Sequence, residues 1–305
     1  MDYTLVEVFS LPFMARALAT VVVLALAAGV VGLGISFREL EFVSDGLVHA
    51  VFPGLVIGAA VGGSAGLLPG AVGAALIAAV LFTVLGRRTN GGGNDVAIAV
   101  VLTGLFSLGV VLVSQQHSYV SQLQALLFGH LLTVTPEQFW QIVVVAVLAV
   151  GIMLLTLRAQ LFRAFDPVGF AAAGFRPLAT DLALAAATAL LTVAGVQALG
   201  VLMVVALLTV PMAVARLLTR RFALLIPIAV LVPLAAGSLG LWWSFAWSVD
   251  TGGTVSAGAV VVLLLVAAYG IAVLWRLAGR ALARLGGGAD AGAARSGAAT
   301  GGGAR

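Results

Sequence analysis

Long apolar runs, separated by short polar or glycine-rich connections, cover almost the whole sequence. A helix that crosses the hydrocarbon core of a bilayer needs about 20 predominantly apolar residues, and runs of that length recur throughout the chain. They differ from the alternating segments of about ten residues that are typical of a transmembrane β-barrel. The pattern therefore predicts an all-α fold, a polytopic bundle of transmembrane helices.

Nine segments are long and apolar enough to cross a membrane separately. They are residues 14–37, 41–63, 66–85, 95–114, 139–157, 178–199, 200–218, 222–247 and 254–275. The seventh is the least regular, because Gly195 and Gly200 lie near its start and Pro211 lies inside it. A broken helix at membrane depth is tolerated only where protein or a water-filled path surrounds it. Eight crossings are therefore the alternative to nine.

Arginines divide the connections into two alternating sets. One set carries them, at positions 38, 87, 88, 158, 163, 176, 216, 220, 221, 276, 280 and 284, whereas the connections 62–68, 115–124 and 248–253 carry none. Because cytoplasmic loops are enriched in basic residues, we expect an extracytoplasmic segment over 1–13 and a transmembrane domain over 14–280. The Gly/Ala-rich residues 281–305 are expected to form a disordered cytoplasmic tail. Nine crossings satisfy this alternation.

Composition excludes a water-soluble domain. Hydrophobic residues make up 62% of the chain and charged residues only 9%, compared with about 25% charged residues in a soluble domain. The 15 basic side chains are all arginine, so a GxxxxGK[ST] nucleotide-binding loop, which needs a lysine, is absent. The chain has no cysteine, which excludes disulfides and thiolate metal ligands. The net charge of +4 is spread over short loops and the tail, which argues against nucleic-acid binding.

One pair of ionisable residues falls inside a predicted transmembrane segment. Asp45 and His49 are four residues apart, so their side chains share one helix face, about 5–6 Å apart at Cβ. A carboxylate and an imidazole suit a divalent first-row metal; nitrogen favours Zn²⁺, and the carboxylate also admits Mn²⁺. Water or a second subunit has to complete the coordination shell. The alternative is that Ser44 or Asp45 caps the helix and that His49 is structural.

The other two histidines carry less information. His117 lies in an arginine-free connection, where we expect a solvated loop residue, with metal capture as the alternative. His130 precedes Pro136 and Glu137, a helix-start signal, and is expected to be structural. No Ser–His–Asp, HExxH or paired-carboxylate arrangement falls on a plausible common face, so we expect no enzymatic activity.

Residues 165–177 predict a short helix between two transmembrane helices, on the cytoplasmic side. Asp166 and Pro167 form a helix-start pair, and Gly174 marks the end of the helix. Apolar anchors of the kind that dock a partner protein are supplied by three phenylalanines, Phe165, Phe170 and Phe175. The alternative is an interfacial helix that rests on lipid headgroups.

The string RELEFVSDGLVHAVFPG, at residues 38–54, resembles the signature of the ABC-3 family of metal-ion permeases, the membrane subunits of zinc and manganese ABC importers. Its pattern Ser-Asp-x-x-x-His-Ala-x-x-Pro-Gly is met at Ser44, Asp45, His49, Ala50, Pro53 and Gly54. Further stretches resemble the family in order along the chain, at residues 95–114, 126–134, 165–177 and 196–218. A looser similarity to the vitamin B12 and iron-siderophore permeases implies the same general architecture.

The resemblance implies a permease subunit of an ATP-driven importer of divalent metal ions, in the plasma (inner) membrane of a bacterium. It implies a cytoplasmic ATP-binding subunit, an extracytoplasmic metal-binding solute-binding protein and a second copy of the chain as partners. In that homodimer, two Asp45–His49 pairs would supply four metal ligands. Residues 165–177 would couple the ATPase to the permease, through Asp166, Phe170 and Gly174.

No permanently bound cofactor is expected, because the Zn²⁺ or Mn²⁺ is the transported cargo, and the histidine favours zinc. Two alternatives are an ABC permease for a metal chelate and a secondary metal transporter driven by an ion gradient. Secondary transporters typically show inverted repeats and additional intramembrane charges, and the sequence displays neither.

Overall fold

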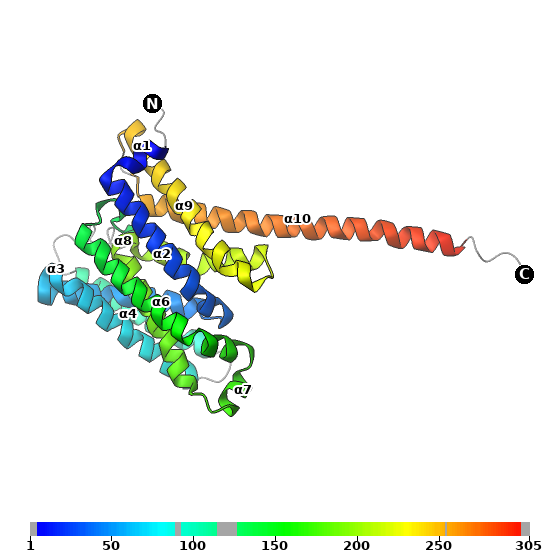
Figure 1. Cartoon of the computed structure of the whole chain (residues 1–305). Helices are drawn as coiled ribbons and strands as arrows, with labels where there is room; N and C mark the ends of the chain where they lie inside the picture. Colours follow the sequence, from blue (N-terminus) through cyan, green and yellow to red (C-terminus); the bar gives the residue numbers. More distant parts are fainter. Residues whose placement is uncertain (1–4, 89–92, 115–126, 254, 300–305) are drawn as a thin grey trace, which may run out of the picture.

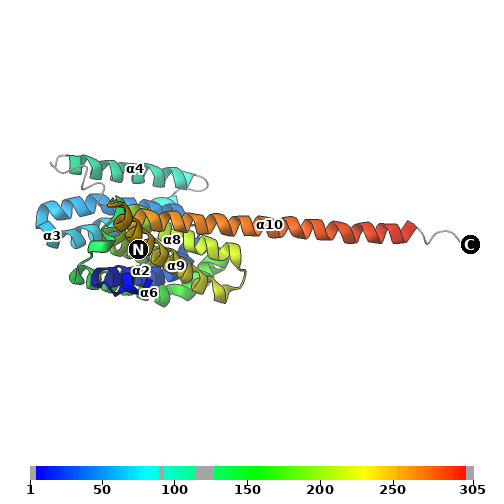
Figure 2. The ribbon, with the colours of Figure 1, turned by 90° about the horizontal axis from the view of Figure 1, so that it is seen from above.

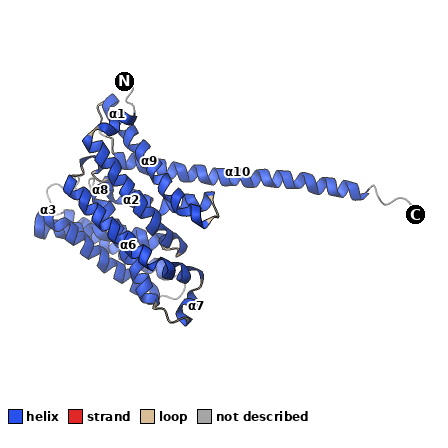
Figure 3. Ribbon diagram, in the orientation of Figure 1, coloured by secondary structure: helices blue, strands red, loops and turns tan. Residues whose placement is uncertain are grey.

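The computed structural model describes residues 5–88, 93–114, 127–253 and 255–299, and every regular element in these ranges is helical (Figures 1 and 3). In chain order the elements are α1 (Leu5–Ser10), α2 (Pro12–Phe37), α3 (Glu41–Arg88), α4 (Gly93–Ser114), the 3₁₀ turn η1 (Leu131–Thr133), α6 (Pro136–Phe165), α7 (Pro167–Ala172), α8 (Pro177–Leu218), α9 (Phe222–Thr251) and α10 (Ala257–Ala299). Eight helical segments of the described residues are long and apolar enough to cross a membrane. The predicted all-α, polytopic bundle is confirmed.

Two transmembrane segments are joined at Gly63 to make α3. The backbone at Gly63 leaves the helical region, with φ 56° and ψ −140°, a conformation that glycine adopts without a steric cost. The two halves of α3 pack closely, because a Cβ added to Gly58 would overlap the carbonyl oxygen of Gly66, and one added to Gly54 would overlap that of Gly70. These glycines therefore let the two halves of α3 form a helical hairpin.

A second reversal lies inside α8, at Gly200, where φ is 78° and ψ is 164°. Asp181, near the start of α8, accepts a hydrogen bond of 2.6 Å from Arg38. Arg216, near the end of α8, donates one of 2.9 Å to the carbonyl oxygen of Ser36. Both ends of α8 therefore lie beside the end of α2. A straight helix would hold Asp181 and Arg216 about 50 Å apart, so α8 must fold back.

Because of the bend at Gly200, α8 can be counted either as one membrane segment or as two. When α8 is counted as one helix, the described residues contain eight membrane-length segments, which is the alternative count of crossings. Its two halves nevertheless coincide with the separately predicted segments 178–199 and 200–218. They pack on each other, since a Cβ added to Gly195 would lie 2.6 Å from Cγ2 of Val204. The predicted interruption of the helix is therefore present at Gly200, and both halves of α8 are helical up to that residue.

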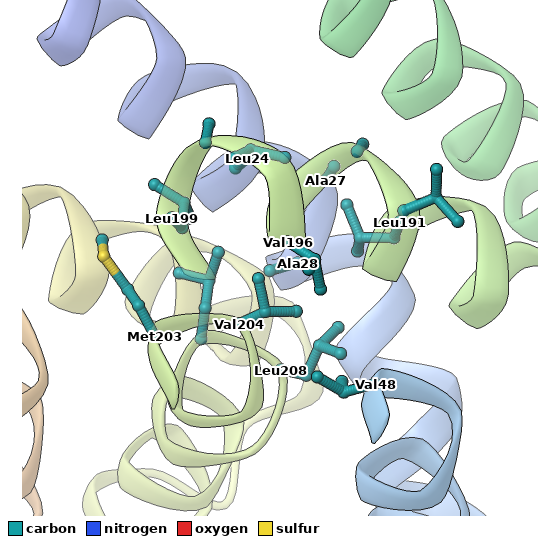
Figure 4. Close-up of a cluster of buried hydrophobic side chains, with 14 of the residues drawn as sticks. Leu24, Ala27, Ala28, Val48, Leu191, Val196, Leu199, Met203, Val204 and Leu208 are labelled. Carbon is teal, nitrogen blue, oxygen red and sulfur yellow. The ribbon is translucent and has the colours of Figure 1, made fainter. Parts of the chain in front are cut away.

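The core of the bundle is built around α8, which contacts α2, α3, α6, α9 and α10. In the most apolar window of α8, 72% of the residues are buried, compared with 17% in that of α4. Figure 4 shows a cluster in this core, in which side chains of α2, such as Leu24, and of α3, such as Val48, meet the two halves of α8. By contrast, α4 packs mainly against α3 and lies at one side of the molecule (Figure 2).

The last helix, α10, overlaps the expected C-terminal tail, residues 281–305. It continues without interruption from Ala257 to Ala299, through residues for which the glycine content favoured disorder, and extends away from the bundle (Figures 1 and 2). Alanine has the highest intrinsic helix propensity, and proline, the strongest helix breaker, is absent from this stretch. The expected disorder of the tail over 281–305 stays a prediction.

Candidate metal path and coupling segment

The Asp45–His49 pair lies on one face of α3, as its spacing predicts. Oδ1 of Asp45 is 3.6 Å from Nε2 of His49, and the side chains are 32% and 23% exposed. The helix begins one turn earlier, at Glu41, and the hydroxyl of Ser44 donates a 2.7 Å hydrogen bond to the Glu41 carbonyl oxygen. Ser44 and Asp45 therefore lie inside the helix and not at its N-cap, whereas the structural role of His49 in that alternative stays a prediction.

The imidazole of His49 has unused hydrogen-bonding capacity. Its Nδ1 is buried and has no hydrogen-bond partner among the described residues. The ring meets the edge of the Phe106 ring at a centroid distance of 5.3 Å, with an interplanar angle of 85°. Pro53 has no N–H, so the carbonyl oxygen of His49 also lacks its usual partner one turn along the helix. Buried polar atoms are normally paired, and His49 is therefore an unusual residue for a purely structural role.

A complete metal shell is not formed by one chain alone, as far as the described residues extend. They contain no group of three His, Cys, Asp or Glu side chains close enough to share an ion. Asp45 and His49 supply two ligands, and a divalent transition metal takes at least four. Their role as ligands stays a prediction, and it needs water or a second copy of the chain.

A charged cluster at the arginine-rich end of the bundle joins α2, α6 and α8. Asp181 accepts hydrogen bonds from Arg38 Nη2 at 2.6 Å and from Arg163 Nε and Nη2 at 2.7 Å each. Gln160, which is 1% exposed, accepts from Arg38 and donates to the carbonyl oxygen of Thr180. Asp181 therefore links the ends of three helices, in addition to any stabilisation of the start of α8 by its charge.

Sequence reasoning did not find this cluster. Its members come from three helices, and Arg38 and Asp181 are 143 positions apart. A hollow of about 200 Å³ lies beside it, and its lining includes Arg38, Arg163 and Asp181 as well as Ser44, the neighbour of Asp45. The arginine-rich end is therefore connected by a hollow to the helix that carries the Asp45–His49 pair.

The predicted short helix is present as α7, and its ends are formed as expected. The carboxylate of Asp166 accepts a 2.7 Å hydrogen bond from the backbone N–H of Gly169, which caps the first turn. Just after the helix, Gly174 has a φ of 79°, a left-handed conformation that glycine adopts readily. Asp166 and Gly174 thus fix the shape of the segment between α6 and α8.

Phe170 does not lie on the outer surface of α7. Its side chain is fully buried, stacked on Phe175 at a centroid distance of 4.9 Å and packed against Phe162 at 5.5 Å. The guanidinium of Arg163 lies 5.9 Å from the centre of its ring. Phe170 is therefore an internal anchor of α7 within its own chain, and not a side chain presented to a partner.

The exposed apolar side chains of this segment are different ones. Val168 is 79% exposed, Phe165 70% and Phe175 50%. Val168 was missed in the sequence, because a six-residue helix is too short for periodicity to show which face turns outward. The surface available for docking is therefore formed by Val168 with Phe165 and the outer part of Phe175.

Of the remaining histidines, only His130 falls within the described residues, and its printed backbone contact is outside this site. His130 donates its backbone N–H to the carbonyl oxygen of Ala198 at 3.0 Å, next to the bend at Gly200, so its predicted structural role agrees with its position. A Cβ added to Gly129 would lie 2.5 Å from the backbone nitrogen of Gly200, which shows how closely the two backbones meet. His117 lies outside the described residues.

The fold is that of a multi-pass membrane protein, with eight membrane-length segments among the described residues and a short helix, α7, between two of them. The chain belongs to the ABC 3 transport family, whose sequence model matches residues 10–274. The predicted family is confirmed, and with it a multi-pass protein of the bacterial plasma membrane.

Relatives resemble the chain over most of its length. The manganese transport system membrane protein MntC of Listeria monocytogenes is 29% identical over 253 residues, which cover 83% of this chain and 89% of that protein. The manganese transport system membrane protein MntB of Synechocystis is 28% identical over 272 residues, covering 88% and 85%. The solved structure of PsaBC from Streptococcus pneumoniae in complex with Fab matches with a TM-score of 0.73 and 24% identity, covering 88% of this chain and 94% of that one. At that identity, the likeness to PsaBC shows a shared fold.

Proposed function

We propose that the chain is the permease subunit of an ATP-driven importer of divalent metal ions, in which Asp45 and His49 bind the ion in transit. The observation that carries the proposal is the buried Nδ1 of His49, which has no partner among the described residues, in a side chain 3.6 Å from the Asp45 carboxylate. Ionisable groups inside transmembrane helices are costly and usually mark an ion or substrate path. A partner such as a transported cation would satisfy both groups.

Manganese is the first candidate for the cargo and zinc the second. The relatives MntC and MntB are named as manganese transport proteins. One carboxylate and one imidazole per chain suit either ion. The carboxylate of Asp45 is a hard oxygen donor, which also admits manganese. The histidine alone had favoured zinc.

A homodimer completes the coordination shell. Two copies related by a twofold axis would bring two Asp45–His49 pairs together and supply four ligands, enough for a tetrahedral site. A transported ion must also be released, so a shell shared between two subunits has the advantage that it opens when the subunits move. This arrangement explains why each pair is partly exposed in the single chain.

Energy for transport comes from a separate ATPase, because the chain has no lysine for a nucleotide-binding loop. The exposed apolar side chains of Val168, Phe165 and Phe175, in and beside α7, are suited to docking in a groove on that subunit. An extracytoplasmic solute-binding protein would deliver the ion at the opposite end. Asp166, Phe170 and Gly174 act in coupling by keeping α7 in shape.

Uptake by proteoliposomes tests the proposal. The permease, reconstituted with its ATPase, should accumulate Mn²⁺ only with ATP, and Asp45→Asn should abolish this accumulation while Asp250→Asn, an exposed acid at the end of α9, should not. Uptake on a proton gradient without the ATPase would instead establish a secondary transporter. Uptake of a chelated metal, with none of the free ion, would establish a chelate permease.

A further inference from the structure

Four arginines converge on a hollow that the transport mechanism does not use. The hollow has a volume of about 330 Å³ and lies where the end of α8 and the start of the connection to α9 meet α10. Its basic lining consists of Arg216, Arg220, Arg276 and Arg280. No carboxylate lines it among the described residues. It is separate from the Asp181 cluster, which uses Arg38 and Arg163.

Three of the four arginines lie on two helices, α8 and α10, and Arg220 lies in the connection that follows α8. Arg276 and Arg280 are one turn apart and share a face of α10. Arg216 lies in the last turn of α8 and is held by α2, where its Nη1 donates to the carbonyl oxygen of Ser36 at 2.9 Å and to the Ser36 hydroxyl at 2.8 Å. Its guanidinium also lies 5.5 Å from the centre of the Phe37 ring. One wall of the hollow is therefore fixed before any ligand arrives.

Like charges that converge in this way repel each other, and an anion relieves the repulsion. None of the ion pairs between described residues involves these four arginines. The hydrogen bonds that Arg216 makes within the described residues all come from Nη1, so its other N–H groups face no acceptor there. Guanidinium groups match the geometry of phosphate oxygens, to which they bind in a bidentate manner.

Neighbouring side chains are of the kinds found at the level of the lipid headgroups. Trp275 is 74% exposed and precedes Arg276 directly, and tryptophan is enriched at the membrane–water interface. Leu274, Leu277 and Leu218 are 66%, 53% and 49% exposed, which gives an apolar surface beside the basic one. A ligand with a phosphate and long hydrocarbon chains fits both surfaces, whereas a free phosphate uses only one of them.

We propose that this hollow binds the phosphate of an anionic glycerophospholipid, such as phosphatidylglycerol, whose acyl chains lie along Leu218 and Leu277. Basic pockets between transmembrane helices at the cytoplasmic side bind lipid headgroups in this way. The bound lipid would fasten α10 to the end of α8 at the point where α10 leaves the bundle (Figure 2). The proposal does not depend on which ion is transported.

Native mass spectrometry of the delipidated, full-length chain tests the proposal by titration with dioleoyl phosphatidylglycerol and dioleoyl phosphatidylcholine. The wild type should bind phosphatidylglycerol more tightly than phosphatidylcholine. The double variant Arg276→Gln/Arg280→Gln should bind phosphatidylglycerol about 30-fold more weakly, or about fivefold for each arginine removed, with phosphatidylcholine binding unchanged. Replacement of both by lysine should retain most of the preference and shows that the helix still folds.

A matched control removes two exposed arginines that do not line the hollow, in the variant Arg158→Gln/Arg176→Gln. This variant should bind phosphatidylglycerol as the wild type does, and equal weakening in both double variants would reduce the effect to general charge attraction and overturn the proposal. Displacement of the lipid by millimolar inorganic phosphate would show a free-anion site, also against it. Unchanged lipid binding in Arg276→Gln/Arg280→Gln, with loss of ATPase co-purification, would make the hollow a protein-docking surface.

Discussion

Arg163 binds both carboxylate oxygens of Asp181, with Nε to Oδ1 and Nη2 to Oδ2 at 2.7 Å each. The pair joins the last turn of α6 to the first turns of α8 and so closes the segment that carries α7. Arg38, from the end of α2, binds the same carboxylate. These contacts hold the two ends of the α7 segment rigidly to the membrane helices. A displacement of α7 would therefore move α6 and α8, as a coupling element requires.

Asp181→Asn should lower stability and weaken coupling together. The variant removes the negative charge of the side chain that accepts three hydrogen bonds. It leaves Arg38 and Arg163, which are only 13% and 17% exposed, without a counter-charge. We expect a loss of about 2–3 kcal/mol in the free energy of unfolding, measured by thermal unfolding in detergent. Arg158→Gln, at an exposed position on α6, is the control. A variant as stable as wild type, with normal ATP-dependent uptake, would show that the cluster is dispensable.

Val168→Asp should disrupt docking of the ATPase without unfolding the permease. Val168 is 79% exposed, so a charge there meets water in the free chain but the apolar groove of a partner in the complex. Co-purification of the ATPase and ATP-dependent uptake should both fall, with thermal unfolding unchanged. Ala223→Asp, an exposed position at the start of α9, should leave both intact. If Val168→Asp retains full co-purification, α7 rests on lipid headgroups instead.

Phe170→Ala, unlike Val168→Asp, should lower the stability of the permease itself. Phe170 is fully buried between Phe162 and Phe175, and removing a buried aromatic ring costs about 3–5 kcal/mol. We therefore expect a clear drop in thermal stability, with α7 misplaced and coupling lost as a consequence. Phe175→Ala, which removes a half-exposed ring, should cost less. Equal stability of wild type and Phe170→Ala would contradict the packing described for α7.

Features that depend on residues close together in the sequence could be predicted from it, whereas contacts between distant residues could not. Apolar length and local signals are properties of neighbouring residues, so the membrane segments, the Asp166–Pro167 helix start and the Asp45–His49 face were all predictable. The contact of Arg38 with Asp181 depends on the packing of three helices. The close approach of Gly54 to Gly70 also required the structure, because a glycine within an apolar run does not show what lies against it.

Asp45→Asn and His49→Ala should each abolish metal uptake and leave folding intact. Both side chains are partly exposed, and the hydrogen bond of Ser44 to Glu41 in the first turn of α3 does not involve them. Loss of a direct ligand should reduce the uptake rate by more than the about 10- to 100-fold typical of outer-shell partners. Radiotracer uptake and thermal unfolding separate the two effects. Normal uptake by the double variant would return both residues to a structural role.

Single cysteines should reveal which end of the bundle faces the cytoplasm. The chain has no cysteine, so His117→Cys and Asn90→Cys each introduce one reporter, at positions outside the described residues. Because the arginine-rich connections are expected to be cytoplasmic, a membrane-impermeant maleimide added to intact cells should label position 117 and spare position 90. Permeabilised cells, in which both positions should react, control for accessibility. Labelling of position 90 alone in intact cells would invert the topology and place α7 and the Asp181 cluster outside, where no ATPase could reach them.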